Sequence, residues 1–227
     1  MSLDARLRFD TLVVGHANRL AAAAARAVAE SPGRVYNPLV IYGASGLGKT
    51  HLLGAIAHQA AEQHAGLRWE YVSMLTFIDA WHAAIAAGAT EAWEARWQAV
   101  DLLLLDDIQF LTGRQETQAE LMRLFERLHA QGRQVVLTSD RPPSEIADVD
   151  ERLLARMQGG LIADVGRPDF ETRAAILRAM VREREQTIAV ALLDELARYE
   201  FANVRELHGA LNRLTAQLAL GDEPVSI

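Results

Sequence analysis

Cysteine is absent from the 227-residue sequence, and lysine nearly so: 22 of the 23 basic residues are arginine, and only Lys49 is lysine. The lack of cysteine excludes disulfide scaffolds, cysteine-based zinc sites and thiol nucleophiles. The longest uncharged apolar runs, such as residues 21–25 and 102–105, are far too short to span a bilayer. The first residues also lack the apolar stretch of a secretion signal. We therefore expect a cytoplasmic protein.

Acidic residues outnumber basic ones by 30 to 23, which gives a formal net charge of −7 at pH 7. This balance argues against broad, salt-dependent binding to duplex DNA. Half of the residues are hydrophobic, so the chain can bury a sizeable core. The strong preference for arginine draws attention to Lys49, because a compact ammonium on a slim stem can act where a guanidinium cannot.

The hydrophobic pattern alternates between strands and helices and then becomes purely helical. Strands are predicted at 38–42, 69–73, 102–105, 135–139 and 161–163, and helices at 17–30, 49–65, 75–87, 90–98, 116–130, 170–185, 191–199 and 203–220. The alternation predicts an α/β fold with a doubly wound, five-stranded parallel sheet, and the helical tail predicts a small C-terminal all-α lid. We place the boundary near Gly166 and Pro168, which gives an α/β subdomain over 1–166 and a helical subdomain over 167–227.

A glycine-rich segment, residues 43–50, matches the phosphate-loop pattern G-x-x-x-x-G-K-[ST] between a predicted strand and a predicted helix. Its glycines let backbone N–H groups curl around an anion, and the helix N-terminus adds a favourable dipole. Lys49 is expected to reach the outer phosphates and Thr50 to place its hydroxyl on Mg²⁺. The alternative is an ordinary glycine-rich turn, which the strand–helix context and the single lysine disfavour. The remaining predicted nucleotide contacts of the loop are Gly43, Ser45, Gly46, Leu47 and Gly48.

Two carboxylates follow the apolar run 102–105, in the form of a Walker B strand. Asp106 is expected to hold Mg²⁺ directly or through water, and Asp107 to orient or deprotonate the attacking water. Ligands of open α/β sheets bind at the carboxyl ends of the strands, which is also where the phosphate loop lies. The alternative is a pair of solvated acids that cap a helix. The phosphate loop upstream favours the functional interpretation.

Several segments resemble the AAA+ ATPase domain of the bacterial replication initiator DnaA, over about residues 7–220. They are FDTLVVG at 9–15, YNPL at 36–39, the phosphate loop with HLL at 51–53, DDIQF at 106–110, TSDRPP at 138–143 and NVRELHGAL at 203–211. The resemblance implies an AAA+ P-loop NTPase fold that uses ATP or ADP with Mg²⁺.

The same resemblance implies roles for residues outside the two nucleotide motifs. Asp140 falls on the sensor 1 position, Arg205 on sensor 2, and Arg156 on the arginine finger that reaches the nucleotide of a neighbouring subunit. Val13 and Val14 would flank the adenine, and His51 would join the nucleotide-binding set. Without the resemblance, Arg156 is interpreted as a solvated salt-bridge residue and Arg205 as a helix N-terminal residue with no ligand.

The predicted helices within 77–100 resemble the initiator-specific motif, which lines a single-strand path in filaments. Few basic residues accompany them, which predicts weak strand binding, although Arg114 adds one positive charge. Trp81, Trp93 and Trp97 could stack on bases, but the i, i+4 spacing of Trp93 and Trp97 favours packing between them. We expect single-stranded DNA, if bound, to contact these helices and Arg114.

The chain starts where the family's ATPase domain starts and ends before its connecting helix and helix-turn-helix, so we expect origin-sequence recognition to lie outside it. Both a fragment and a short paralogue fit this length. We favour a weakly hydrolysing ATP switch that self-assembles through Arg156 and works with replication proteins in initiation. The alternatives are a regulatory paralogue or helicase loader that acts on a partner protein, and a nucleotide-bound scaffold without hydrolysis.

Overall fold

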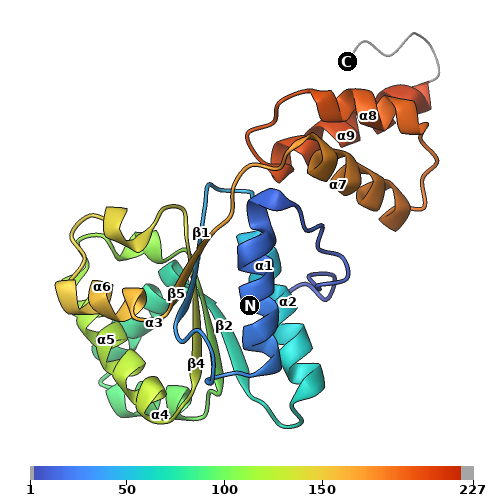
Figure 1. The fold of residues 1–227 in the computed structure, drawn as a ribbon. Coiled ribbons are helices and arrows are strands. Elements are labelled where there is room, and N and C mark those ends of the chain that lie inside the picture. Colours follow the sequence, from blue (N-terminus) through green and yellow to red (C-terminus); the bar gives the residue numbers. More distant parts are fainter. Residues whose placement is uncertain (1–2, 221–227) are drawn as a thin grey trace.

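A computed structural model describes residues 3–220, in which a central sheet of parallel strands is flanked by helices (Figure 1). The strand order is β2-β3-β4-β1-β5, and it contains the five strands predicted from the sequence. Neighbouring strands pair in parallel register, with Leu39 of β1 opposite both Val136 of β4 and Leu161 of β5. The strands are β1 (Leu39–Tyr42), β2 (Trp69–Ser73), β3 (Leu102–Asp106), β4 (Gln134–Ser139) and β5 (Leu161–Asp164).

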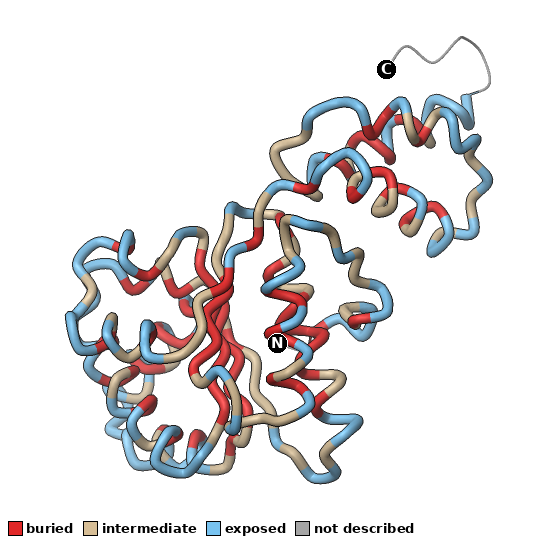
Figure 2. The backbone as a smooth tube through the Cα atoms, viewed as in Figure 1, coloured by how far each residue is buried: buried red, intermediate tan, exposed pale blue. Residues whose placement is uncertain are grey.

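Alternate residues of the central strands point into two separate apolar cores. Leu102 and Leu104 of β3 belong to the core beneath α1 (Arg19–Glu30) and α2 (Lys49–Gln63), whereas Leu103 and Leu105 belong to the core on the opposite face. That second core lies beneath α3 (Met74–Ala86), α4 (Thr90–Gln98), α5 (Gln115–Ala130) and α6 (Glu151–Gln158). Because both faces are covered, the central strands are buried throughout (Figure 2). The predicted doubly wound sheet is thus confirmed.

The indole rings of the helices at 77–100 are part of the second core. Trp81, Trp93 and Trp97 are 7%, 5% and 1% exposed, and the ring centroids of Trp93 and Trp97 lie 5.3 Å apart. Trp93 also donates a hydrogen bond of 3.1 Å to the buried Glu120. The packing interpretation of Trp93 and Trp97 is therefore confirmed, and Trp81 is equally inaccessible to a base in this conformation.

Helix α6 is the one regular helix of residues 3–220 that the sequence pattern did not predict. It has only eight residues, and two of them, Leu153 and Met157, are buried one turn apart. The Asp150 carboxylate caps its N-terminus by accepting hydrogen bonds from the backbone N–H groups of Arg152 (2.9 Å) and Leu153 (3.3 Å). Short 3₁₀ turns follow or overlap the ends of three of the sequence motifs: η1 (His16–Asn18), η2 (Ile108–Leu111) and η3 (Pro143–Glu145).

Three C-terminal helices form a unit set apart from the sheet and joined to it by the segment after β5 (Figure 1). They are α7 (Phe170–Glu183), α8 (Val190–Arg198) and α9 (Val204–Leu220), all within two residues of the predicted bounds. Their core is a separate apolar cluster centred on residues such as Leu177, Leu207 and Leu211. Asp169 caps α7 by accepting the Thr172 N–H at 2.8 Å.

No helix in residues 3–220 combines the length and the apolar character needed to cross a membrane.

Candidate nucleotide-binding site

The phosphate-loop segment connects β1 to α2 through backbone conformations that require glycine. Gly46 (φ 79°) and Gly48 (φ 97°) lie in the left-handed region, which L-residues with side chains rarely adopt. A Cβ on Gly43 would stand 2.2 Å from the backbone oxygen of Val165, so a larger residue cannot fit there without displacing the main chain. The glycine spacing of the motif is therefore accounted for by local geometry.

Lys49, the first residue of α2, folds back over this loop. Its Nζ donates hydrogen bonds to the backbone oxygens of Gly43 (2.6 Å) and Ala44 (3.1 Å), and its side chain is buried at 7% exposure. Burial lowers the pKa of the Lys49 ammonium, an effect that the nearby Asp107 and Asp106 carboxylates oppose. The arrangement places one desolvated positive charge at the centre of the loop.

Asp106, at the end of β3, is buried and accepts hydrogen bonds from three hydroxyl groups on three different elements. Thr50 of α2 and Tyr71 of β2 each donate to Oδ2 at 2.9 Å, and Thr138 of β4 donates to Oδ1. The pKa of the Tyr71 hydroxyl is raised by burial and by the negative charge of Asp106, so Tyr71 stays protonated and remains a donor. Sequence reasoning predicted Thr50 at this position but missed Tyr71 and Thr138.

The donor set fits Mg²⁺. The Thr50 hydroxyl and the Asp106 carboxylate are hard oxygen ligands 2.9 Å apart beside the phosphate loop, which is the chemistry that Mg²⁺ prefers. Residues 3–220 contain no group of three or more His, Asp or Glu side chains able to hold a metal ion. The Thr50–Asp106 oxygen pair suits a cation held by one or two protein oxygens together with water and phosphate.

Asp107 and Asp140 lie at the same end of the sheet but differ in their surroundings. Asp107 has a left-handed backbone (φ 63°) that turns it away from β3, and its side chain lines the cavity above the loop. The carboxylate of Asp140, directly after β4, forms a bidentate pair with Arg141 at 2.7 and 3.0 Å. The Arg141 guanidinium lowers the pKa of Asp140, which stays ionised.

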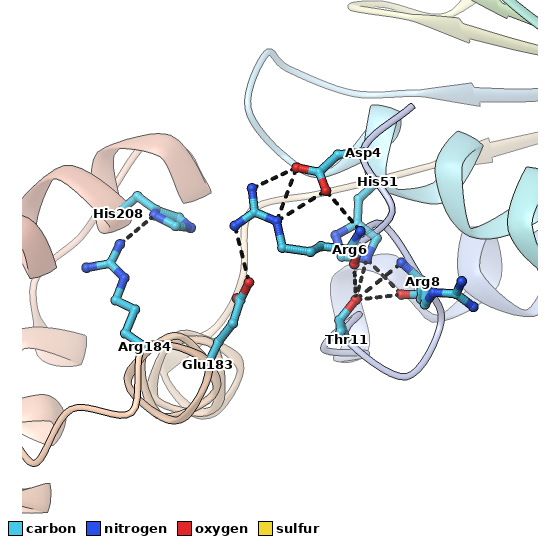
Figure 3. Close-up of polar contacts among 8 residues, drawn as sticks. All are labelled: Asp4, Arg6, Arg8, Thr11, His51, Glu183, Arg184 and His208. Atoms are coloured by element: carbon cyan, nitrogen blue, oxygen red, sulfur yellow. Dashed lines mark hydrogen bonds and ion pairs between the residues drawn. The ribbon is translucent and has the colours of Figure 1, made fainter. Parts of the chain in front are cut away.

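The helical unit contributes the opposite wall of the site. The backbone N–H of Val204 donates to the Gly46 oxygen at 3.0 Å, and the Arg205 guanidinium donates to the Ser45 hydroxyl at 2.7 Å. One turn further along α9, His208 faces the same cavity. Arg184 donates to Nδ1 of His208 at 3.3 Å (Figure 3). The sequence predicted Arg205 at this site but not His208.

These groups enclose a cavity of about 200 Å³ between the loop and α9. Seven of its nine lining residues were predicted from the sequence, and Val204 and His208 were not. The lining consists of Ser45, Gly46, Gly48, Lys49, Thr50, Asp107, Val204, Arg205 and His208.

The other predicted contact residues lie outside this cavity lining. Val14 is 45% exposed, Val13 is half-buried, and Leu47 is buried in the apolar core beneath α1 and α2. His51 turns away from the loop, and its Nε2 lies 2.8 Å from the Arg8 oxygen and 3.3 Å from the Thr11 hydroxyl (Figure 3). Burial lowers the pKa of His51.

Arg156 and Arg114 lie on the surface away from the cavity lining. Arg156, a half-buried residue on α6, has a guanidinium with no hydrogen bond or ion pair to any residue between 3 and 220. The exposed Arg114 side chain, before α5, donates to the Phe110 oxygen at 3.1 Å. Neither arginine forms an ion pair with a carboxylate of residues 3–220.

The segment before α1 contacts the helical unit as well. The Arg6 guanidinium pairs with Asp4 and also reaches Glu183, at the end of α7, at 3.4 Å (Figure 3). Both the Arg6 and the Glu183 side chains are largely exposed, so this ion pair contributes little to stability.

Comparison with known proteins identifies close relatives. The family model described as the bacterial DnaA ATPase domain matches residues 3–164. The chromosomal replication initiator protein DnaA of Deinococcus radiodurans is 46% identical over 225 residues, covering 99% of this chain and 48% of the relative. DnaA of Herpetosiphon aurantiacus is 45% identical with the same two coverages. The chain therefore spans about half the length of the curated relatives it matches.

Solved structures with the same fold include nucleotide-bound proteins. Domain III of the Thermotoga maritima replication initiation protein DnaA is similar at a TM-score of 0.92 and 36% identity, covering 99% of this chain and 94% of that one. AMPPCP-bound DnaA from Aquifex aeolicus is similar at a TM-score of 0.87 and 33% identity, with coverages of 96% and 67%. The DnaC helicase loader, at 14% identity and a TM-score of 0.62, shares the fold alone.

Proposed function

The chain belongs to the family of bacterial DnaA ATPase domains, and from this membership we propose that it is an ATP-binding, slowly hydrolysing AAA+ switch module in the initiation of DNA replication. One observation carries the proposal. One cavity is lined by the buried Lys49, by Thr50 and by Arg205. Asp106 lies next to this cavity, because its carboxylate accepts a hydrogen bond from the Thr50 hydroxyl. A polyphosphate with a divalent cation has the charges and oxygens that this set would recognise.

Binding would exchange internal hydrogen bonds for bonds to the nucleotide. The Lys49 Nζ would leave the Gly43 and Ala44 oxygens for phosphate oxygens, which are stronger, charged acceptors. The loop N–H groups and the N-terminus of α2 add favourable dipoles for the same anion. Thr50 and Asp106 would hold Mg²⁺, which supplies neutralisation of the charge on the outer phosphates. Val13 and Val14 would flank the adenine, and His51 would join the nucleotide-binding set.

Hydrolysis of ATP to ADP and phosphate would depend on residues at the ends of β3 and β4. Asp107, which lines the cavity, would orient the attacking water and accept its proton. Asp140 would sense the outer phosphate from the end of β4. With one carboxylate at the cavity and no described arginine other than Arg205 lining it, we infer that turnover by a single copy is slow.

A second copy of the chain would supply the missing positive charge. Arg156 is unpaired within residues 3–220 and lies outside the cavity lining, as expected for a guanidinium that serves the nucleotide of a neighbour. We therefore propose that the module self-associates in its ATP state. A structure of replication initiator DnaA bound to AMPPCP and single-stranded DNA supports binding of such a strand. We propose that the strand contacts α3, α4 and Arg114, and that the contact is weak because few basic residues lie there. Replication proteins of the cytoplasm are the expected partners.

Bound nucleotide would change the relative position of two units of the chain. We propose a nucleotide-binding α/β subdomain over 1–166 and a helical lid over 167–227. The separate apolar clusters of the sheet and of α7–α9 support this division. Because Arg205 comes from α9 and Lys49 from α2, a phosphate bound between them would bias the position of one unit relative to the other.

Calorimetric titration with Mg·ATP and Mg·ADP tests the proposal. We expect binding to the intact chain, a loss of at least about tenfold in affinity for Lys49→Ala, and partial retention in Lys49→Arg, which keeps the charge but not the compact ammonium. Arg198→Ala, on the exposed surface of α8, is the matched control and should bind like the unmodified chain. A folded sample that binds neither nucleotide would overturn the proposal.

A further inference from the structure

The two carboxylates after the β3 run of leucines are held in different ways. Asp106 accepts three hydroxyl hydrogen bonds, whereas the Asp107 carboxylate accepts, from residues 3–220, the amide of Gln109 alone. This bond joins Gln109 Nε2 to Asp107 Oδ1 at 3.1 Å. It leaves Oδ2 of Asp107, a residue that lines the cavity, without a hydrogen-bond partner among the described residues. That free oxygen can accept a proton from a water molecule.

The other end of the Gln109 amide is also engaged. Its Oε1 accepts the backbone N–H of Asp140 at 3.2 Å, so a single side chain connects the end of β3 to the end of β4. These two partners determine the orientation of the amide. If it were flipped, its oxygen would face a carboxylate and its NH₂ would face an N–H group.

The backbone around Gln109 keeps this side chain in place. Gln109 lies in the η2 turn, and two residues of that turn, Ile108 and Leu111, are fully buried in the core beneath α3–α6. The backbone N–H of Asp107 donates to the Thr138 hydroxyl at 3.0 Å, which fixes the turn from its other side. The Asp107 carboxylate is thus positioned by a rigid neighbour, although its own backbone is in the left-handed region.

We infer that Gln109 is a positioning residue for ATP hydrolysis: it orients the Asp107 carboxylate towards the attacking water and ties it to the Asp140 segment. The inference rests on the proposed ATPase function. Gln109 lies outside the cavity lining, so it contributes to the rate of hydrolysis and not to the affinity for nucleotide. Loss of its amide lets Asp107 rotate away, which removes an alignment that general-base catalysis requires.

Gln109→Leu tests the inference, because leucine keeps the approximate volume and removes both hydrogen bonds. The single-turnover rate of Mg·ATP hydrolysis should fall by about tenfold or more, while the calorimetric affinity stays within about twofold. In an Asp107→Ala background the same substitution should change the rate by less than about twofold, because the residue through which Gln109 acts is gone. Gln131→Leu, on an exposed residue after α5, is the matched control for the chemical change.

Three results would overturn the inference: an unchanged rate in Gln109→Leu, a lost affinity for Mg·ATP in that variant, or an equal loss of rate with and without Asp107. The thermal midpoint of each variant shows that it is folded. Failure of the proposed function gives a different result, because the unmodified chain would then fail to bind or to hydrolyse ATP.

Discussion

Tyr71 and Asp106 lie on neighbouring parallel strands, and the Tyr71 hydroxyl donates a 2.9 Å hydrogen bond to the Asp106 carboxylate. Tyr71→Phe removes this donor from a buried charge while keeping the ring. We expect the free energy of unfolding to fall by about 1–2 kcal/mol, because a buried acceptor loses one of its partners. Urea denaturation measures the change. Tyr36→Phe, on a 46% exposed side chain, should have almost no effect; equal losses in the two variants would contradict the prediction.

Gly46 is predicted to be intolerant of a side chain. Alanine at this position would need a φ of 79° and would bring its Cβ to 3.0 Å from the Asn203 side chain. We expect Gly46→Ala to lose about 1–2 kcal/mol of stability and to bind Mg·ATP more weakly, because both the loop and the α9 contact are disturbed. Gly209→Ala, in α9 with open space around its Cβ position, should instead gain about 0.5–1 kcal/mol. Stabilisation by both substitutions would exclude the expected strain.

Stability is predicted to depend on pH through His51. Burial lowers the folded-state pKa of His51 below its ordinary value of 6.5, so the unfolded chain binds this proton more readily. The contribution of neutral, buried His51 to the free energy of unfolding is therefore fully present above pH 6.5. It is lost as the pH falls below that value towards the folded-state pKa of His51. His51→Gln removes the titration and keeps a side-chain donor for the Arg8 oxygen. The thermal midpoint of the unmodified chain should fall more than that of the variant between pH 7 and pH 5.5; parallel curves would exclude the effect.

Arg156→Ala is predicted to separate assembly from binding. Its guanidinium has no partner within residues 3–220 and does not line the cavity, so the variant should fold and bind Mg·ATP like the unmodified chain. Sedimentation velocity with Mg·ATP should show loss of the oligomer. Arg152→Ala, on the same helix and 82% exposed, is the matched control and should assemble normally. An undiminished oligomer in Arg156→Ala would show that another residue joins the copies.

Residues whose position depends on local chain geometry were predicted well from the sequence. The phosphate loop is one continuous strand–turn–helix unit. Its glycines, Lys49 and Thr50 therefore lie close together independently of how the other elements pack. The central strands β1, β3 and β4 were found because their apolar runs are buried on both faces. Helix α6 was missed because two buried residues in an eight-residue, charge-rich segment do not make a helical pattern.

Residues that meet across the sheet could not be predicted in the same way. Tyr71 and Thr138 reach Asp106 because β2 and β4 both lie beside β3, and strand order is not encoded in sequence spacing. His208 reaches the cavity because of how α9 docks on the loop. Its signal was present in the sequence: it follows Arg205 by three residues and therefore shares one helix face.

The hydrogen bond between Val204 and Gly46 joins the main chain of α9 to the main chain of the phosphate loop. Most side-chain substitutions leave such a bond intact, and proline at position 204 is the exception because it removes the N–H. Evolution can therefore vary the chemistry of neighbouring side chains, such as Arg205 and His208, while the attachment of the two units persists.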